Sequence, residues 1–284
     1  MNRQLLAQLS LKWNPFAPDV PVEALRTTPA LESFCFRVEQ LAREGGFARL
    51  TGDPGTGKSA ALRLLVERLG KLPELTIGIL TRPQCSVPDF YREMGDLFGV
   101  SLSPHNRWAG TKTLRSRWAA QLEAALFRPV LVIDEAQEIQ PIVLNELRLM
   151  SSTELDSRLL LTVVLAGDQR LLEKLHREDL RPLDSRMRVR LNLEPMSSAE
   201  LAITLRLALA AAGNPKLMTD ELIETLCDHA TGNLRALMSL GAELLDAAIQ
   251  REVARLDEKL FLEVVAGVTE PARAAAGGTG RRKR

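Results

Sequence analysis

The chain has 284 residues, of which 45% are hydrophobic and 26% charged, and its formal net charge is +1. This length allows one large domain or two modest ones, and the small net charge argues against a strong whole-molecule attraction to nucleic acid. Cys35, Cys85 and Cys227 lie far apart, so no disulfide framework or paired-cysteine zinc site is indicated, and a reducing, cytoplasmic setting is expected. No apolar run reaches the roughly 18 to 20 residues of a membrane span and no secretory leader is visible, so we expect neither anchoring nor secretion.

Residues 1–45 are predicted to form an amino-terminal arm and a helix. Residues 1–30 contain Trp13, Phe16 and several prolines, a composition that favours extended chain with little regular structure beyond a short initial helix. A helical spacing of apolar residues then begins at about residue 31 and continues to residue 44.

Short apolar runs alternate with helical segments through residues 46–194. The first run, 47–51, leads into a glycine-rich loop, and a helix is predicted over 60–69 after the loop. Further strands are predicted at 75–80, 130–134, 159–166 and 189–193. Because parallel neighbours need long crossovers, this alternation predicts an α/β fold with a five-stranded, mostly parallel sheet covered by helices on both faces.

Residues 195–266 are predicted to form a small all-helical domain. It begins at Ser197 and Glu200, which have the spacing of a capping box. Its helices are expected at about 198–212, 220–230, 234–250 and 257–265. Residues 267–284 are rich in alanine, glycine and arginine and are expected to be a disordered basic tail.

The loop at residues 52–59 matches the pattern G-x-x-x-x-G-K-[ST]. In this pattern, backbone N–H groups surround the triphosphate of ATP, the lysine reaches the outer phosphates and the final hydroxyl ligates Mg²⁺. The expected nucleotide-binding residues are Gly52, Pro54, Gly55, Thr56, Gly57, Lys58, Ser59 and Ala60. The alternative is a glycine-rich turn without a ligand, but the strand before the loop and the helix after it favour the nucleotide.

Two adjacent acids end the apolar run at 130–134. We expect Asp134 to hold Mg²⁺ and Glu135 to orient and polarise the water that attacks the γ-phosphate. A solvated acidic turn is the alternative. The run Asp-Glu-Ala-Gln at 134–137 also occurs in two-lobed helicases, which need a second motor lobe that this length cannot hold, and the glycine-rich signature of a transporter-type ATPase is absent.

Polar residues follow the fourth predicted strand, where Asp168 or Gln169 is placed to sense the γ-phosphate. An ordinary polar turn between strand and helix is the alternative. In the helical domain, Arg235 stands at a predicted helix start from which it could fold over the nucleotide, with a plain surface role as the alternative.

The segment 181–190 is dense in arginine and is a candidate source of an arginine finger. Such a finger neutralises charge in the transition state and is often supplied by a neighbouring subunit. Arg186 is the first choice, and Arg188 and Arg190 are the other candidates. A solvated basic edge is the alternative.

These elements, in this order, resemble the AAA+ ATPases, and more narrowly the ExeA, TniB, TnsC and MuB group near the origin initiators. The resemblance covers about residues 13–265. Its specific parts are Trp13 to Phe16 and residues 50–59, 133–137, 147–150 and 164–167. It implies a three-layer αβα AAA+ domain followed by a helical lid, with ATP and Mg²⁺ held between subunits of a homo-oligomeric ring or helical filament. It also places Trp13 and Phe16 among the nucleotide-binding residues, whereas Asp168 departs from the amide or hydroxyl usual at its position.

Residues 97–122 contain no carboxylate and carry a group of cations with two tryptophans, Trp108 and Trp118, interleaved. The expected DNA-binding residues are Arg107, Lys112, Arg115 and Arg117. Such a surface suits phosphate contacts, which give affinity without reading sequence. In the resembled group, DNA-contacting elements come from this region. A solvated helix with core tryptophans is the alternative.

The leading hypothesis is therefore an ATP-dependent regulator of DNA transposition that assembles on double-stranded DNA and recruits a transposase. An ExeA-like ATPase for secretion-machinery assembly and an origin initiator or helicase loader are the alternatives. The first of these families adds a membrane span and a cell-wall-binding segment, and the second adds a sequence-reading domain. Neither addition is seen after residue 266, which favours the transposition hypothesis.

Overall fold

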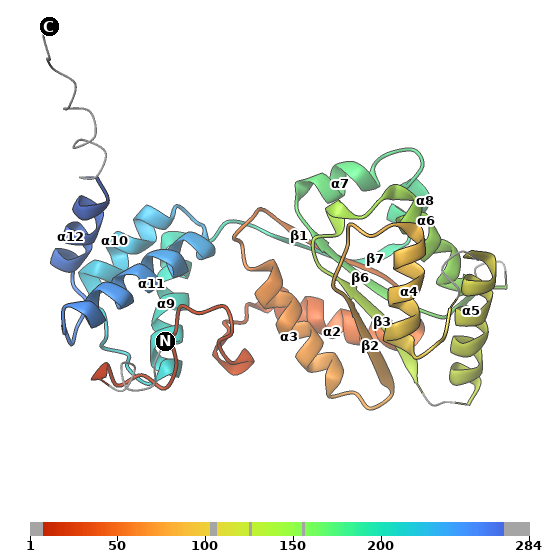
Figure 1. The fold of residues 1–284 in the computed structure, drawn as a ribbon, viewed down its shortest axis with the longest axis horizontal. Helices are drawn as coiled ribbons and strands as arrows, with labels where there is room; N and C mark the ends of the chain where they lie inside the picture. The colour runs from red at the N-terminus through yellow and green to blue at the C-terminus, as the bar shows by residue number, and fades with distance from the viewer. Residues whose placement is uncertain (1–7, 103–106, 125–126, 155–156, 270–284) are drawn as a thin grey trace, which may run out of the picture. The chain divides into compact units, whose positions relative to one another are not determined.

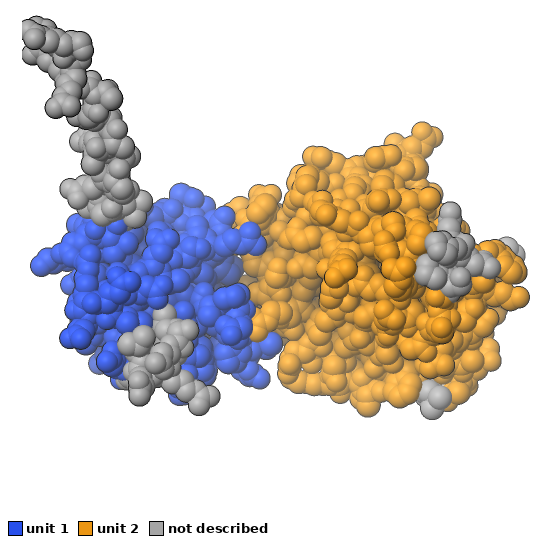
Figure 2. Space-filling model, in the orientation of Figure 1, with its two compact units in different colours: residues 1–26, 196–284 blue, residues 27–195 orange. Residues whose placement is uncertain are grey.

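The computed structural model describes residues 8–102, 107–124, 127–154 and 157–269. The chain divides into two compact units (Figure 2): unit 2 spans residues 27–195, and unit 1 combines residues 1–26 with residues 196–284. The expected initial helix, in so far as it involves residues 1–7, and the basic tail beyond residue 269 lie outside the described residues.

A five-stranded sheet forms the centre of unit 2, with the strand order β2-β3-β6-β1-β7 (Figure 1). Every neighbouring pair is parallel, which confirms the predicted α/β fold. The strands are β1 (Gly46–Gly52), β2 (Leu75–Leu80), β3 (Arg128–Ile133), β6 (Thr162–Gly167) and β7 (Met187–Leu193). Because all five run the same way, their carboxyl ends meet at one edge, where ligands bind in such sheets.

One expected strand, 159–166, is divided between two structures. Its first residue belongs to a short antiparallel hairpin of β4 (Ser152–Thr153) and β5 (Arg158–Leu159), and its residues from 162 onward belong to β6. The apolar run is continuous through Leu160 and Leu161, both buried, so hydrophobicity alone does not mark the division.

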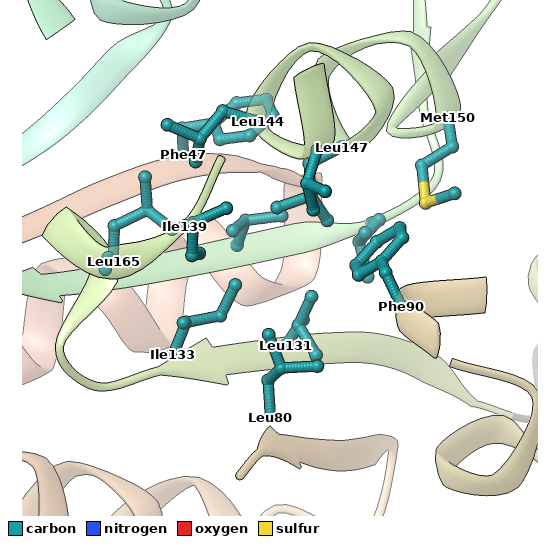
Figure 3. Close-up of a cluster of buried hydrophobic side chains, with 14 of the residues drawn as sticks. Phe47, Leu80, Phe90, Leu131, Ile133, Ile139, Leu144, Leu147, Met150 and Leu165 are labelled. Carbon is teal, nitrogen blue, oxygen red and sulfur yellow. The ribbon is translucent and has the colours of Figure 1, made fainter. Parts of the chain in front are cut away.

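Alternate residues of the central strands enter different hydrophobic clusters, as the period of two in a strand requires. Leu131 and Ile133 pack in the cluster drawn in Figure 3, which α4, α5, α6, α7 and α8 cover. Val130 and Val132 pack on the opposite face against α2 and α3. The helices of unit 2 are α2 (Pro29–Glu44), α3 (Lys58–Gly70), α4 (Val87–Phe98), α5 (Arg107–Glu123), α6 (Pro141–Met150), α7 (Gln169–Leu175) and α8 (Arg181–Asp184), with a 3-10 turn η2 (Ala136–Glu138).

The helices that the described residues of unit 1 form are α9 (Ser198–Ala212), α10 (Asp220–Ala230), α11 (Leu234–Gln250) and α12 (Glu258–Thr269), together with the short 3-10 turn η1 (Val22–Ala24). The predicted capping box is confirmed, because the Ser197 side chain accepts from the Glu200 N–H while the Glu200 side chain accepts from the Ser197 N–H. The last helix extends past its expected end, so residues 267–269 are helical rather than part of a tail. Within the described residues, no helix has the length and hydropathy that a membrane span requires.

The amino-terminal arm contributes to the core of unit 1. Leu9, Leu11 and Phe16 are buried in the same cluster as the apolar faces of α9 to α12. The Lys12 N–H donates to the Ala212 carbonyl at 2.8 Å, which fixes the arm against the end of α9. The Phe16 ring lies so close to α11 that a Cβ added at Gly241 would be 2.4 Å from its Cε1 atom.

Candidate active site

The glycine-rich loop joins the end of β1 to the start of α3 and has the backbone geometry of an anion cradle. Gly55 and Gly57 adopt φ values of 88° and 97°, in the left-handed region that favours glycine. A Cβ on Gly52 would lie 2.7 Å from the Leu193 carbonyl and from the Thr56 hydroxyl, so a side chain would not fit there. The loop therefore presents the amino-terminal N–H groups of α3 without obstruction, which is the arrangement that binds phosphate.

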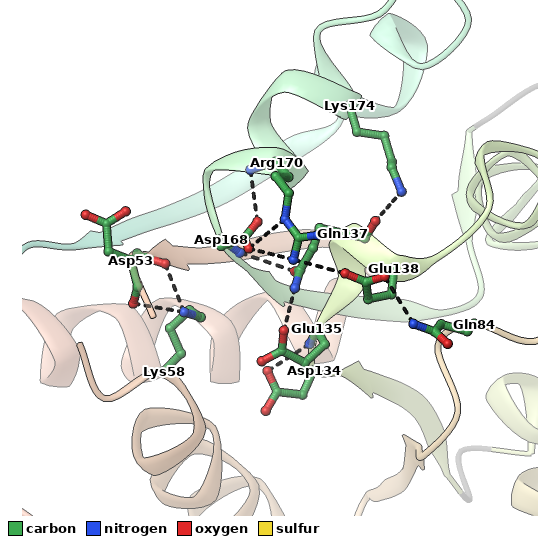
Figure 4. Close-up of polar contacts among 11 residues, drawn as sticks. Asp53, Lys58, Gln84, Asp134, Glu135, Gln137, Glu138, Asp168, Arg170 and Lys174 are labelled. Atoms are coloured by element: carbon green, nitrogen blue, oxygen red, sulfur yellow. Dashed lines mark hydrogen bonds and ion pairs between the residues drawn. The ribbon is translucent and has the colours of Figure 1, made fainter. Parts of the chain in front are cut away.

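Lys58 begins α3 and turns its side chain into the loop. The Lys58 side chain is buried, and its Nζ donates to the carbonyls of Gly52 at 2.9 Å and Asp53 at 3.0 Å (Figure 4). The Thr56 hydroxyl donates to the same Asp53 carbonyl at 2.8 Å. These bonds hold the ammonium beside the backbone N–H groups, where its charge favours an anionic ligand.

The structure brings together Ser59 and Asp134, which are far apart in the sequence. The Ser59 hydroxyl donates to Asp134 Oδ2 at 3.0 Å, and the other carboxylate oxygen accepts from the Glu135 N–H at 2.9 Å. Neighbouring ligands of an octahedral Mg²⁺ ion, each about 2.1 Å from the metal, lie about 3 Å apart. The two oxygens therefore have the chemistry and the spacing to ligate one such ion.

Glu135 occupies an unusual backbone conformation directly after β3. Its φ is 51°, in the left-handed region, and its side chain is exposed at the carboxyl edge of the sheet. Non-glycine residues in this region are uncommon and cluster at functional sites. The carboxylate accepts a hydrogen bond from the Gln137 side-chain amide.

The end of β6 places Asp168 at the N-cap of α7. One carboxylate oxygen accepts from the Arg170 N–H and the other from Arg170 Nε, each at 2.9 Å. The hydrogen bond from the Arg170 guanidinium to the Asp168 carboxylate raises the pKa of Arg170. Gln169 follows as the first, exposed residue of α7. The Asp168 carboxylate is thus engaged in capping and pairing, while Gln169 extends from the same turn.

The three candidate finger arginines differ in their contacts. Arg188 pairs with Glu44 at 2.8 Å, and Arg190 donates to the Asp184 carbonyl at 2.9 Å. Arg186 is half-buried and donates to the Pro182 carbonyl, one turn earlier, at 2.9 Å. Asp184 also accepts from Arg49 of β1 at 3.2 Å, so this arginine-rich turn is anchored to the sheet.

The cationic segment forms α5, but its residues do not share one face. Trp118 is completely buried and packs edge-on against Phe98, with ring centroids 5.3 Å apart, so its predicted place on the cationic surface is wrong. Trp108 is 74% exposed, with Lys112 Nζ 5.2 Å from its ring centre.

The other two cations of the described part of α5 point in different directions. A cavity of about 840 Å³ is lined by Trp108, Lys112 and Arg115, together with Leu149 of α6. Arg117 is two residues beyond Arg115 and therefore points roughly 200° away from it around the helix. The side chain of Arg107 lies outside the described residues.

Three predicted nucleotide-binding residues belong to unit 1. Phe16 is 6% exposed within the core of this unit, which leaves almost none of its ring available to a ligand. This burial corrects the expectation that it contacts nucleotide. Trp13 is half-buried against the same cluster. Arg235 is exposed in the first turn of α11, after the N-cap residue Asn233.

Some polar residues around the site were not predicted from the sequence. Gln137 bridges Glu135 and Asp168, and Lys174 of α7 donates to the Ile139 carbonyl at 2.7 Å. Burial lowers the pKa of Lys174. The run Asp-Glu-Ala-Gln was visible as a pattern, but Asp168, the distant partner of its glutamine, follows another strand and leaves no local signal.

The fold and the phosphate loop define the class of protein. Residues 41–175 match the family model described as "AAA domain". Together with the parallel sheet and the helices that follow it, this match shows that the chain carries an AAA+ ATPase domain. The predicted resemblance to AAA+ ATPases is confirmed at the level of this domain.

A narrower relationship comes from one curated relative. The chain is 33% identical over 221 residues to general secretion pathway protein A of Aeromonas hydrophila, and the match covers 76% of this chain and 39% of that protein. The chain therefore spans well under half of the length of that relative. This similarity supports the ExeA-like part of the predicted group and gives no support to its transposition members.

Solved structures show the same fold. Cdc6p from Pyrobaculum aerophilum superposes with a TM-score of 0.69 and 17% identity, covering 93% of this chain and 74% of that chain. Drosophila ORC, in a structure bound to DNA, gives a TM-score of 0.68 and 18% identity, covering 96% of this chain and 67% of that chain. At these identities the likeness concerns the fold alone.

Proposed function

We propose that this chain is an ExeA-like assembly ATPase, which binds and hydrolyses ATP and transmits its nucleotide state to components of a secretion machine. The main observation in favour of ATP hydrolysis is the hydrogen bond between Ser59 and Asp134 beside the phosphate loop. The similarity to general secretion pathway protein A supports the assignment to secretion. ATP use and three free cysteines favour a cytoplasmic location for this part of the protein.

In this proposal the loop binds the phosphates of ATP. The N–H groups of the loop and of the first turn of α3 donate to the phosphate oxygens, and the helix dipole adds to the attraction. The Lys58 ammonium then exchanges its bonds to the Gly52 and Asp53 carbonyls for the outer phosphates. Ala60, in the first turn of α3, belongs to the same surface.

Ser59 and Asp134 supply the oxygen ligands for Mg²⁺, with the remaining positions left to phosphate and water. Bound there, the ion would neutralise charge that develops on the β- and γ-phosphates. A hydroxyl and a carboxylate suit this hard cation. The direct Ser59 to Asp134 hydrogen bond marks the place where the two oxygens converge.

Glu135 is the residue we propose to orient the attacking water. Its carboxylate stands at the carboxyl edge of the sheet, one residue after the proposed metal ligand. Phosphoryl transfer depends mainly on positioning and charge stabilisation, so a fixed acceptor for a water proton is the contribution expected here. Arg186 would supply charge stabilisation to a neighbouring subunit, and Asp168 or Gln169 together with Arg235 would respond to the bound nucleotide.

The secretion proposal now takes precedence over transposition, which was the leading expectation from the sequence. The reason is the 33% identical relative, a secretion protein by name. Because the chain spans 39% of that relative, the point at which it ends does not separate the two functions. A homo-oligomer with nucleotide between subunits remains part of the proposal under either function.

A DNA-binding regulator of transposition, acting with a transposase, is the second candidate, and the cationic helix α5 is the observation in its favour. Lys112 and Arg115 line one cavity with the exposed Trp108, an arrangement that suits phosphate and base contacts. Neutralising both cations should weaken binding to duplex DNA and flatten its dependence on salt. An unchanged salt slope would remove α5 from any DNA surface.

Phosphate release by the Glu135→Gln protein tests the catalytic proposal. We expect binding of a fluorescent ATP analogue to be retained and turnover to fall by at least about a hundredfold, since the acceptor of the water proton is lost. Glu173→Gln, on the exposed face of α7, is the matched control and should turn over normally. Equal hydrolysis by the Glu135→Gln protein would refute the role.

A segment exchange tests the assignment to secretion. The matched 221 residues of the Aeromonas protein are replaced by those of this chain, and protein secretion is measured in cells that lack the native protein. Restored secretion that is lost again with Glu135→Gln is expected. The DNA-binding candidate would be favoured by two results together. The exchange protein would be stably expressed but fail to restore secretion, and the original chain would bind duplex DNA in a salt-dependent way.

A further inference from the structure

Gln137 is a buried amide that makes two different hydrogen bonds at the edge of the sheet. Its Nε2 donates to a carboxylate oxygen of Glu135, and its Oε1 accepts from the Asp168 N–H at 3.2 Å (Figure 4). Only 5% of Gln137 is exposed, although Glu135 itself is open to solvent. One side chain thus connects the proposed catalytic carboxylate after β3 to the first residue after β6.

The chemistry of its two neighbours fixes the orientation of this amide. A backbone N–H can only donate, so the Asp168 N–H requires the carbonyl oxygen of the glutamine. An ionised carboxylate can only accept, so Glu135 requires the NH₂ group. Rotating the amide by 180° would break both bonds. The bridge therefore depends on an amide, and neither glutamate nor an apolar side chain can reproduce it.

The surrounding residues hold the bridge in place. A Cβ added at Gly167 would lie 2.6 Å from Gln137 Oε1, so only glycine lets the amide approach the strand this closely. On the other side, Lys174 donates to the carbonyls of Gln137 and Ile139, which fixes the backbone of η2. A buried amide on a fixed backbone has little rotational freedom.

The hydrogen-bonded chain that begins at Gln137 extends beyond Asp168 to residues nearer the surface. Arg170 donates to Asp168 and pairs with Glu138 at 3.0 Å, and Glu138 accepts from the Gln84 amide at 3.1 Å. The turn between β6 and α7 is thereby tied to the loop after β2 as well as to Glu135. Movement of this turn would therefore shift the Glu135 carboxylate, because a continuous chain of hydrogen bonds connects the two.

We propose that Gln137 is a positioning residue for ATP hydrolysis, which fixes the Glu135 carboxylate and couples it to the turn between β6 and α7. This inference rests on the proposed function of Glu135. The amide occupies one side of the carboxylate and leaves the other oxygen to accept a proton from the attacking water. Without it, an exposed glutamate side chain samples several rotamers, and the loss of orientation lowers the rate of the chemical step rather than the affinity for ATP.

The first test compares Gln137→Met and Gln137→Glu with the wild-type chain. Methionine keeps the length of the side chain and removes both bonds, while glutamate retains an acceptor for Asp168 but cannot donate to Glu135. Both variants should lower kcat at least about tenfold and leave the Kd for a fluorescent ATP analogue within about twofold. Gln140→Met is the matched control, because Gln140 is exposed and its side chain does not cap α6.

A second test asks whether Gly167 acts through the amide. Gly167→Ala should lower kcat by displacing Gln137 Oε1, and the same substitution should have a much smaller effect in a Gln137→Ala background. A merely structural defect would instead give independent, multiplicative losses. If Gln137→Met folds poorly, the dependence of the Gly167→Ala effect on residue 137 still tests whether Gln137 positions Glu135.

The outcomes separate the inference from the function on which it rests. Normal turnover by Glu135→Gln would overturn the proposed role of Glu135 and the inference with it. Loss of turnover in Glu135→Gln with normal or raised kcat in both Gln137 variants would overturn the inference alone. Equal losses in kcat and ATP affinity, or multiplicative effects of Gly167→Ala and Gln137→Ala, would likewise show that Gln137 does not position Glu135.

Discussion

Gly241→Ala tests whether the amino-terminal arm is an integral part of the unit 1 core. In an ordinary helix interior, replacing glycine by alanine stabilises by about 1 kcal/mol. Here the new Cβ would lie 2.4 Å from Phe16 Cε1 and 2.5 Å from Cδ1, far inside the 3.5 to 4.0 Å at which carbon atoms attract. Overpacking of this kind costs roughly 1 to 3 kcal/mol, so the net change should be a loss of about 1 kcal/mol.

The sign of the effect depends on the Phe16 ring. In a Phe16→Val background the clashing ring atoms are absent, so the same Gly241→Ala change should stabilise α11 by about 1 kcal/mol. The difference between the two backgrounds, a coupling of about 2 kcal/mol, reports the contact directly. Propensity alone predicts the same gain in both backgrounds.

Amide hydrogen exchange across α11 provides the measurement, because it reads the stability of this helix within the whole chain. Protection of α11 should fall in Gly241→Ala, and the double variant should be better protected than Phe16→Val alone. Equal gains in both backgrounds would show that the arm does not pack on Gly241, and the assignment of residues 9–16 to this core would then be wrong.

Three further outcomes are expected. Lys58→Ala should abolish binding of a fluorescent ATP analogue, and affinity within about tenfold of wild type would contradict its phosphate contact. Arg186→Ala should lose turnover and regain it when mixed with Glu135→Gln, which contributes an intact finger; full activity of a dilute monomer would exclude a finger in trans. Hydrogen bonds from Ser197 lower the pKa of Glu200, so its capping contribution of about 0.5 kcal/mol is present at neutral pH and lost as the pH falls through that lowered pKa. Glu200→Gln should therefore flatten the acid limb of the unit 1 stability profile, and an unchanged limb would contradict the cap.

Much of the fold could be predicted because its signals are local. The central strands β3 and β6 come from short apolar runs, and Val130 to Ile133 alternate between two buried faces, which is why that run is apolar throughout. The phosphate loop and the capping box at Ser197 are also defined by a few consecutive residues. Helix bounds such as Ser198–Ala212 follow directly from such signals.

The features that were missed depend on contacts between distant segments. Phe16 is recognisable as an apolar residue, but only the folded chain shows that it packs on Gly241. The bridge from Gln137 to Asp168 likewise joins two turns that follow different strands, η2 after β3 and the turn after β6. Trp118 is a different case, because it shares the buried face of α5 with Leu114 at a spacing of four residues, a periodicity that the sequence already contained.

Unit 1 is built from two segments that are separated in the sequence by the whole of unit 2, and this arrangement has a consequence for its synthesis. Residues 27–195 form a continuous unit that can fold while translation is still in progress. The arm is translated before unit 2, yet its buried residues, among them Leu9, Leu11 and Phe16, find their partners only after residues of the helices that follow unit 2 have been made. A nascent chain therefore exposes the apolar residues of the arm after residues 27–195 have been made, until the helices of unit 1 follow and bury them.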